Sequence, residues 1–315
     1  MSKAEEPPLV AVVGPTAIGK TAIGIALAER VGGEIVSADA VAVYRDLDIG
    51  SAKPDASERA RVPFHLLDVA DPVDNFTLAD FESQANAAIA HIRTQRCVPL
   101  LVGGTGLYVR SVTATLTVPN VAPQEAFRAD RWHEVETIGA PGLHMRLAAI
   151  DPRSAAKILP GDAKRIIRAL EVYEVTGQPL SHFHTPEGVQ GVPRPNTLIF
   201  GLQMDRETLY QRIEARVDAM MAAGFLDEVR ALLAAGFDAD LKSMQSLGYR
   251  HLLNHLTAGQ PLEETIAEIK RDTRRYAKRQ ISWFNADPQV RWIDVSARVV
   301  APEAVADAIV KQIEK

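Results

Sequence analysis

One segment of the chain has the residue types and the spacing of a phosphate-binding loop. Residues 14–21 read GPTAIGKT, that is, a glycine, four residues, and then Gly-Lys-Thr. In such a loop, glycines let backbone amides point toward phosphate oxygens, and the helix that follows adds the positive end of its dipole. Lys20 would neutralise a phosphate and the Thr21 hydroxyl would ligate magnesium. A tight glycine turn without a ligand is the alternative. The segment predicts a phosphate or diphosphate site made by Gly14, Pro15, Thr16, Ala17, Ile18, Gly19, Lys20 and Thr21.

Two further residues follow apolar runs that should be neighbouring strands. Asp39 comes directly after residues 34–38 (EIVSA), and Thr105 follows residues 98–102 (VPLLV) within Gly-Gly-Thr-Gly. The carboxyl ends of parallel strands meet at one edge of a sheet, where ligands gather. Asp39 is then placed to act as a metal ligand or a base, unless it only closes a turn. Thr105 faces the same edge, unless it only caps the next helix.

The elements that must position these residues alternate between strands and helices. Buried strands are predicted at 9–13, 34–38, 98–102, 197–202 and 290–295, and helices run from Lys20 to Gly32-Gly33 and over 77–93. This alternation predicts an α/β fold with a parallel sheet flanked by helices. Residues 119–190 show only helical patterns, with Asp151 and Asp162 as helix N-caps. We therefore expect a core of residues 1–118 and 191–315 and an all-helical insertion of residues 119–190.

Composition and charge narrow the class of protein. The chain has 315 residues, one cysteine and a net charge of −5. It has no apolar run long enough for a membrane span and no apolar core for a secretory signal, so we expect a cytoplasmic protein. A disulfide or a cysteine zinc cluster is excluded, and Cys97 is expected to be a small buried residue. Basic residues are concentrated in residues 270–279 (KRDTRRYAKR), which carry a local charge of +5.

Several successive motifs give the chain a resemblance to a known family. GPTAIGKT, VSADAVAVYRDLDIGSAKP, FHLLD, LLVGGTGLY, RALEVYEVTG, QSLGYR and AKRQISWF occur in this order between residue 9 and about residue 295. Together they resemble the motifs of bacterial tRNA dimethylallyltransferases. The resemblance implies a P-loop kinase-like core with an inserted helical domain. It also implies a magnesium-dependent transfer from dimethylallyl diphosphate to the exocyclic amine of the adenosine 3′ of the anticodon. The family is often described as ATP-binding because of the same loop.

Roles follow from the resemblance for individual residues. Asp39 matches the general base, Thr105 the residue that assists departure of the diphosphate, and Arg128 a basic residue that helps the transfer. Ala40 and Ala42 depart from the family pattern, which has Ser and a second polar residue, so the resemblance does not carry over the contacts that those polar side chains make with the adenine. The segments implied to contact the tRNA anticodon stem-loop comprise Asp39, Ala40, Val41, Ala42, Lys164, Arg165, Ile166, Ile167, Arg168, Gln245, Ser246, Leu247, Gly248, Tyr249, Arg250, Lys278, Arg279, Gln280, Ile281, Ser282, Trp283, Phe284 and Asn285.

Two other functional classes remain open at this point. An adenylate prenyltransferase or a nucleotide kinase would use the same loop, and so would a nucleic-acid-binding ATPase. A mononucleotide substrate needs neither a helical insertion nor a basic helix, so both features favour tRNA. In the helix predicted at 264–284, the i, i+4 spacing places basic side chains over about half of the circumference. Ile266, Ile269, Ala277 and Ile281 are predicted to face the core. A solvated, charge-rich helix face is the alternative for the basic side. We expect the protein to act as a monomer.

Overall fold

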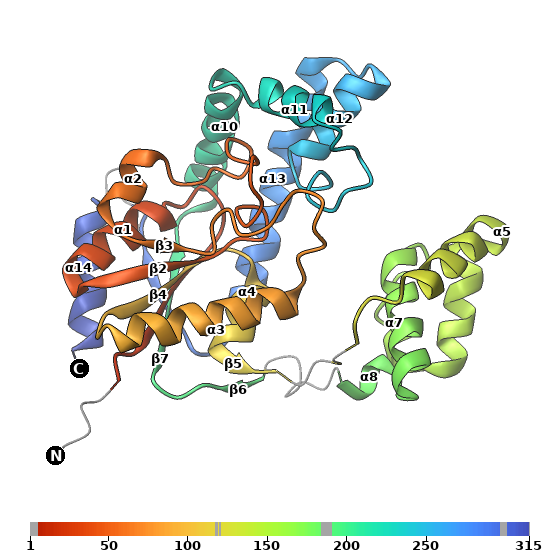
Figure 1. Cartoon of the computed structure of the whole chain (residues 1–315), viewed down its shortest axis with the longest axis horizontal. Helices are drawn as coiled ribbons and strands as arrows, with labels where there is room; N and C mark the ends of the chain where they lie inside the picture. The colour runs from red at the N-terminus through yellow and green to blue at the C-terminus, as the bar shows by residue number, and fades with distance from the viewer. Residues whose placement is uncertain (1–5, 117–118, 120, 184–190, 297–300, 315) are drawn as a thin grey trace. The chain divides into compact units, whose positions relative to one another are not determined.

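A parallel sheet forms the centre of the larger part of the chain (Figure 1). The computed structural model describes residues 6–116, 119, 121–183, 191–296 and 301–314. The six strands have the order β3-β2-β4-β1-β7-β8, and every neighbouring pair is parallel. Their bounds are β1 Leu9–Val13, β2 Gly33–Ala38, β3 Phe64–His65, β4 Val98–Gly103, β7 Thr197–Gln203 and β8 Val290–Asp294. The five predicted strands are confirmed, and the two-residue β3 is an addition that was not predicted.

Alternate side chains of the buried strands pack into two separate cores. Ala11 and Val13 of β1 belong to one hydrophobic cluster, whereas Val10 and Val12 belong to the other. Successive side chains of a strand point to opposite faces, so a fully apolar strand such as β1 needs helices on both sides. The first cluster includes residues of α3 (Leu78–Thr94) and α4 (Gly106–Thr113), and the second includes residues of α1 (Lys20–Val31) and α14 (Pro302–Ile313). The predicted α/β fold is therefore confirmed.

Four helices extend the core after β7. They are α10 Arg206–Ala222, α11 Phe225–Ala234, α12 Tyr249–Ala258 and α13 Leu262–Asn285, and the short α2 Ala56–Arg61 precedes β3. The predicted helix at 264–284 corresponds to α13. Of its expected core residues, Ile269 and Ala277 are buried, while Ile266 and Ile281 are half-buried and pack against the cores.

A second compact unit covers Ala114–Pro193, and the first comprises Met1–Thr113 with Arg194–Lys315. The second unit contains α5 Glu125–Ile150, α6 Pro152–Ala155, α7 Ala163–Thr176 and α8 Leu180–Phe183, and the antiparallel pair β5 Ala114–Thr115 and β6 Val192–Pro193. The bounds of this unit lie a few residues outside the predicted limits of 119 and 190. Residues 117–118, 120 and 184–190 lie outside the described residues.

Both predicted N-caps of the second unit are present. A carboxylate oxygen of Asp151 accepts a hydrogen bond from Ser154 N (3.0 Å), and one of Asp162 accepts from Arg165 N (3.2 Å). Such caps satisfy amides that have no partner inside the helix. The α7 helix ends at Gly177, which has a φ of 66°. The 26-residue α5 is interrupted at Gly139, whose φ of 75° and ψ of 160° are not helical. Leu143, Leu147 and Ile166 are fully or almost fully buried in this unit's own hydrophobic core.

Two expectations from composition can be compared with the structure. In the described parts of the chain, no helix is both long enough and apolar enough to cross a bilayer. The expectation that Cys97 is buried is wrong, because its side chain is only half-buried after the end of α3.

Candidate active site

The loop between β1 and α1 has the geometry of an anion cradle. Gly14 has a φ of 146°, and a Cβ at this position would lie 2.9 Å from the Leu202 carbonyl oxygen, so a side chain cannot be accommodated. Gly19, with a φ of 101°, forms the N-cap of α1. Glycine reaches such positive φ values without steric cost. The predicted loop is therefore followed directly by the N-terminus of a helix, where anions bind favourably.

Lys20 lies at the start of α1 with its ammonium folded back over the loop. Its Nζ donates a hydrogen bond to the Pro15 carbonyl oxygen (2.8 Å). Burial and, to a smaller extent, the nearby Arg216 guanidinium lower the pKa of Lys20 to about 7, against the opposing effect of the Asp39 carboxylate. A phosphate placed in the loop would supply the missing negative charge and favour the protonated form.

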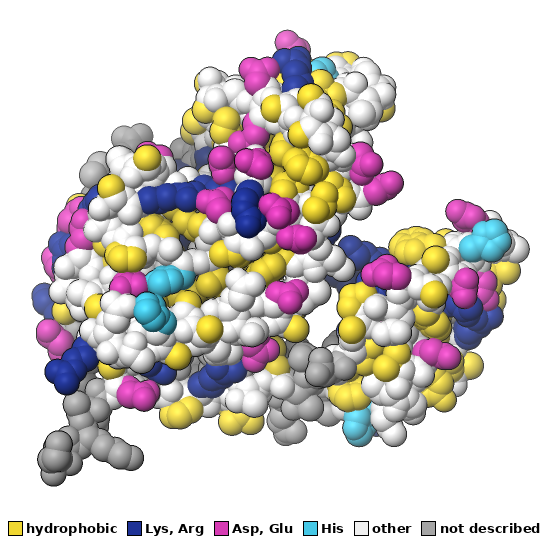
Figure 2. Space-filling view, viewed as in Figure 1, with side chains coloured by type: hydrophobic (Ala, Val, Ile, Leu, Met, Phe, Trp, Pro, Cys, Tyr) yellow, Lys and Arg dark blue, Asp and Glu magenta, His cyan; other side chains and the backbone are white. Residues whose placement is uncertain are grey.

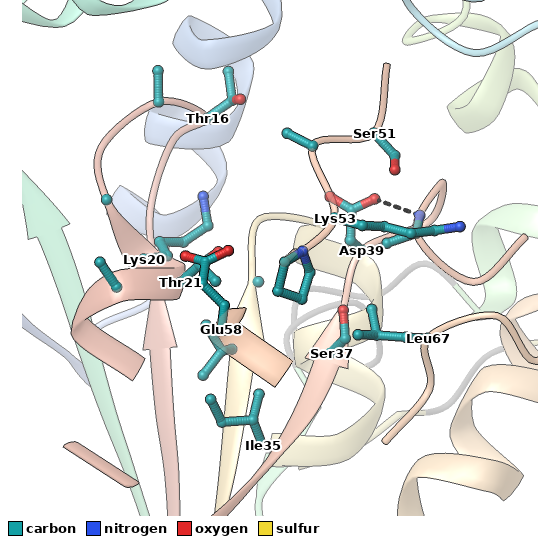
Figure 3. Close-up of a pocket in the computed structure, with 18 of the residues that line it drawn as sticks. Thr16, Lys20, Thr21, Ile35, Ser37, Asp39, Ser51, Lys53, Glu58 and Leu67 are labelled. Atoms are coloured by element: carbon teal, nitrogen blue, oxygen red, sulfur yellow. Dashed lines mark hydrogen bonds between the residues drawn. The ribbon is translucent and has the colours of Figure 1, made fainter. Parts of the chain in front are cut away.

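The loop opens into a cavity of about 420 Å³ at the carboxyl ends of β1, β2 and β4 (Figure 3). Figure 3 shows Thr16, Lys20 and Thr21 of the loop and α1 on one side of the cavity, and Asp39, Ser51 and Lys53 on the other. Apolar walls are formed by Ile35, Phe64, Leu67 and Val102. The cavity thus joins a cationic, phosphate-binding part to an apolar part.

Asp39 follows β2 and lies on the cavity wall, as predicted. Its Oδ1 accepts hydrogen bonds from Val41 N (2.8 Å) and Ala42 N (3.2 Å), so the carboxylate does close the turn. No hydrogen bond of the described residues engages Oδ2. The turn therefore fixes the orientation of the carboxylate and leaves Oδ2 without a hydrogen bond from the described residues. Asp39 can thus close the turn through Oδ1 and still offer Oδ2 to a ligand.

Thr105 joins the ends of two strands. Its Oγ1 accepts a hydrogen bond from Ala40 N (3.1 Å), and its backbone N donates to Ala38 O (3.2 Å). Among the described residues, the hydroxyl accepts no bond from an amide of α4. The side chain thus contacts the turn that holds Asp39 instead of capping its own helix. Asp39 and Thr105 are brought together as the sequence predicted.

Two residues of α13 complete this edge of the sheet. Thr16 N donates to Gln280 Oε1 (2.9 Å), and Gln280 Nε2 donates to Gly104 O (2.9 Å). Tyr276 lines the cavity one helical turn earlier. Burial, together with the charge of Asp39, raises the pKa of Tyr276 to about 12, and contacts with Thr105 and Gln280 act in the opposite direction. Tyr276 was not predicted from the sequence, and Gln280 was predicted to contact tRNA, although its side chain is buried. The i, i+4 spacing of two polar residues on the buried side of a helix was the available signal.

Arg216 of α10 is a second cation that the sequence analysis missed. It lines the same cavity, and in the described residues its guanidinium has no hydrogen-bond or ion-pair partner. Burial lowers its pKa, and the charges of Asp39 and Glu58 oppose that shift. Nothing distinguishes Arg216 from its exposed neighbours along α10 in the sequence. Lys53 is paired with Asp48 and Asp68, so Lys20 and Arg216 are the basic side chains of the cavity wall that remain to bind an anion with more than one charge.

Arg128 lies at the start of α5 in the second unit. Its Nε and Nη2 donate to the two oxygens of Glu171 (2.7 and 2.9 Å). The fully buried Glu171 also accepts hydrogen bonds from Gln124 N (2.7 Å) and Arg168 Nη1 (2.5 Å). Burial would raise the pKa of Glu171, but these donors, Arg128 first, outweigh it and hold the pKa below its usual range. Glu171 therefore positions both predicted arginines, a role that the sequence analysis did not assign.

The segments predicted to contact tRNA divide into exposed and buried side chains. Ala42, Ile166, Ile167, Gly248, Tyr249, Gln280 and Phe284 are buried, so their side chains support the segments rather than offering a surface. Trp283 is half-buried, with the Arg110 guanidinium 4.7 Å from its ring centroid. The exposed members are Lys164, Arg165, Gln245, Arg250, Lys278, Arg279, Ser282 and Asn285.

The basic side of α13 is largely occupied by ion pairs. Lys270 contacts Asp218 (2.6 Å), Arg274 contacts Glu214, and Arg275 contacts Asp272 (3.1 Å). Arg271 likewise contacts Glu268 and Asp272. Figure 2 shows acidic and basic side chains interspersed on the visible face of the larger unit. The local charge of +5 is therefore largely compensated, and Lys278 and Arg279 extend beyond the paired residues.

Comparison with known proteins identifies relatives over almost the whole chain. The sequence profile described as IPP transferase matches residues 42–287, and the one described as isopentenyl transferase matches residues 7–67. A tRNA dimethylallyltransferase of Desulforudis audaxviator (strain MP104C) is 47% identical over 309 residues, covering 98% of each chain. One of Syntrophobacter fumaroxidans (strain DSM 10017 / MPOB) is 49% identical over 290 residues, covering 92% of this chain and 84% of its own length.

Solved structures of similar fold carry related descriptions. The tRNA isopentenylpyrophosphate transferase of Bacillus halodurans superposes with a TM-score of 0.71 at 39% identity, covering 98% of this chain and 97% of its own. A eukaryotic dimethylallyltransferase solved while acting on tRNA superposes with a TM-score of 0.75 at 26% identity, covering 92% of this chain and 74% of its own.

Proposed function

Since this chain belongs to the IPP transferase family, whose curated relatives are tRNA dimethylallyltransferases, we propose that it transfers a dimethylallyl group from dimethylallyl diphosphate to tRNA. The acceptor is the exocyclic amine of the adenosine 3′ of the anticodon, and diphosphate is released. The observation that carries the proposal is the cavity that joins the phosphate loop and Asp39, with the Thr105 hydroxyl hydrogen-bonded to Ala40 N directly after Asp39.

The phosphate loop binds the diphosphate of the prenyl donor. Its backbone amides and the N-terminus of α1 point toward the anion, and Lys20 and Arg216 neutralise its charge. The apolar walls, which include Ile35 and Phe64, accommodate the dimethylallyl group. These residues hold a leaving group whose negative charge increases as its bond to carbon breaks, and they therefore stabilise the transition state.

Magnesium fits the polar residues of this cavity. Thr21, at the start of α1, offers a hydroxyl, while the described residues include no cluster of three or more His, Cys, Asp or Glu side chains that would hold a metal alone. Magnesium is commonly held by one or two protein oxygens together with substrate phosphates and waters. When bound, the ion would supply charge stabilisation to the diphosphate.

Asp39 and Thr105 act on the two reacting partners. The bond between the allylic carbon and the bridging oxygen breaks, and a bond forms between that carbon and the adenine nitrogen. Asp39, oriented by the two amides, accepts the proton that the amine loses. The Thr105 hydroxyl donates to the bridging oxygen, which leaves with the electron pair as diphosphate. Tyr276, kept neutral by its raised pKa, borders the same space without adding charge.

Recognition of tRNA requires more than the cavity. The target adenine is stacked in a loop and must be extruded to reach Asp39, which costs a few kcal/mol. Contacts with phosphates and bases offset this cost, and we assign them to the exposed members of the predicted segments in both units, such as Arg165, Arg250 and Lys278. The family resemblance assigns Arg128, which Glu171 holds, a role in the transfer.

The test is incubation of the purified protein with labelled dimethylallyl diphosphate, magnesium and unmodified tRNA. We expect label in tRNA, at the adenosine 3′ of the anticodon after nuclease digestion. Parallel reactions with AMP and ATP as acceptors test the two other classes. Label in AMP with none in tRNA would indicate an adenylate prenyltransferase, and tRNA-stimulated release of phosphate from ATP without transfer would indicate an ATPase.

A further inference from the structure

The loop between β2 and α2 forms part of the donor cavity but has little structure of its own. Residues Ser51, Ala52, Lys53 and Pro54 all line the cavity. Two non-glycine residues of this loop, Asp46 and Ala52, have left-handed backbone conformations with φ values of 62° and 51°. Such conformations are costly and persist only where surrounding contacts hold them. The position of this cavity wall therefore depends on contacts from outside the loop.

Lys53 holds the loop from the side of the cavity. Its Nζ donates to the Tyr44 carbonyl oxygen (2.6 Å) and contacts the carboxylates of Asp48 (2.7 Å) and Asp68 (2.5 Å). Its side chain is only 2% exposed. The charge of Lys53 is thus matched within the protein, so this residue braces the loop.

Glu228 of α11 holds the loop from the other side. Its Oε2 accepts hydrogen bonds from Asp48 N (3.0 Å) and Ile49 N (2.7 Å), and its Oε1 accepts from Gly50 N (3.2 Å). Three successive backbone amides thus converge on one carboxylate. Hydrogen bonds to a charged acceptor are about twice as strong as those between neutral groups. A helix more than 170 residues away in the sequence therefore fixes the backbone that leads into the cavity wall.

Tyr249 of α12 supports the same carboxylate. Its hydroxyl donates to Glu228 Oε1 (2.7 Å), and burial, together with the Glu228 charge, raises its pKa, so the hydroxyl stays protonated as a donor. The rings of Tyr249 and Phe225 pack edge to face, 5.0 Å apart. A Cβ on Gly50 would lie 2.2 Å from a Phe225 ring carbon and 2.6 Å from one of Tyr249. The loop backbone is therefore seated directly against both rings.

We propose that Glu228, supported by Tyr249, is a positioning residue for binding of the prenyl donor. It touches no part of the cavity and acts by holding residues 48–50, and through them the wall formed by residues 51–54. This inference rests on the proposed function of the cavity. It also gives the buried Tyr249, which the sequence assigned to tRNA contact, a role on the donor side of the reaction.

The test compares Glu228→Gln with Asp227→Asn, which removes the same charge from an adjacent, exposed position whose partner is Arg230. In Glu228→Gln, the carboxamide oxygen can still accept hydrogen bonds from Asp48 N and Ile49 N. The NH2 group then faces Gly50 N, and because both groups are donors, the hydrogen bond to Gly50 is lost. We expect the KM for dimethylallyl diphosphate to rise about tenfold, as for loss of one strong hydrogen bond. We expect kcat to stay within about twofold and the KM for tRNA to be unchanged. Asp227→Asn should match the wild type.

A second variant covers the case in which Glu228→Gln does not fold. Tyr249→Phe keeps the ring against Gly50 and removes the hydroxyl that donates to Glu228, and we expect a rise of about threefold in the donor KM. A donor KM within about twofold of wild type in both folded variants, or an equal loss in kcat and both KM values, would overturn the proposal. Lys20→Ala distinguishes failure of the role assigned to Glu228 from failure of the proposed function, because normal donor binding in that variant would show that the cavity does not bind the donor.

Discussion

Replacing Lys20 by methionine should stabilise the protein in the absence of donor. Burial and Arg216 lower the pKa of Lys20 from 10.5 to about 7, so the folded state disfavours the charged form. Each pH unit between these values corresponds to about 1.4 kcal/mol, which gives an upper limit of about 5 kcal/mol. Loss of the hydrogen bond to the Pro15 carbonyl subtracts about 1 kcal/mol, and relaxation of the charged site reduces the remainder. We expect Lys20→Met to raise the free energy of unfolding by about 2 to 3 kcal/mol at pH 6.5.

The sign of the pH dependence follows from the lowered pKa. Below about pH 7 the lysine is charged in both the folded and the unfolded states, so the full penalty is present. Between pH 7 and 10.5 the folded state binds fewer protons than the unfolded state, and the penalty decreases as pH rises. The advantage of Lys20→Met should therefore decline to below about 1 kcal/mol at pH 9.5.

Urea unfolding of the unliganded protein at pH 6.5, 8.0 and 9.5, at constant ionic strength, measures this difference. Lys311→Met, at an exposed position of α14, is the control and should show no such gain. Inorganic diphosphate should stabilise the wild type more than Lys20→Met, because only the wild type can use the ammonium. A Lys20→Met protein that is less stable than wild type at pH 6.5, or whose advantage is the same at every pH, would refute the reasoning.

Four further outcomes test the site. Asp39→Ala should lower single-turnover transfer about a hundredfold or more with little change in tRNA affinity, and an unchanged rate would exclude a base. Thr105→Ala should slow transfer by about 3 to 4 kcal/mol of activation free energy, whereas early melting with a normal rate would leave it only a structural role. Neutralising Lys278 and Arg279 together should reduce the salt slope of tRNA binding by about one to two, and an unchanged slope would make them a solubilising surface. Arg216→Gln should weaken the binding of inorganic diphosphate, measured by titration, and leave the affinity for tRNA unchanged.

The parts of the site that the sequence predicted are those determined by local chain geometry. β1 and the loop that follows it were predicted to the residue, because a buried strand, positive-φ glycines and a helix start occupy adjacent positions. The positions of Asp39 and Thr105 at one edge of the sheet were also predicted, since Asp39 directly follows β2, Thr105 lies two residues after β4, and parallel strands align their ends. The caps Asp151 and Asp162 are local for the same reason.

The parts that were missed depend on contacts between distant segments. Arg216 faces the cavity only because α10 packs against the core, and no feature of its own helix shows this. Tyr249 and Gln280 were assigned to a surface because they lie in motifs shared with a family that acts on tRNA. Their burial follows from partners on other helices and strands, Glu228 and Gly104 among them. The compensation of the +5 charge of residues 270–279 was likewise not visible in the sequence, because the acidic partners Glu214 and Asp218 are on α10.

The contacts of Gln280 also determine when the site can form during protein synthesis. Thr16 and Gln280 are hydrogen-bonded across 264 residues of chain. At about 5–20 residues per second, a ribosome needs roughly 13 to 50 seconds to proceed from one to the other. Once residue 105 has been added, the nascent chain contains the phosphate loop, Asp39 and Thr105, but it still lacks both Tyr276 and the Gln280 side chain that anchors the loop. A nascent chain therefore cannot assemble the complete site until α13 has left the ribosome, and a product truncated before residue 276 would keep the phosphate-binding motif without the assembled site.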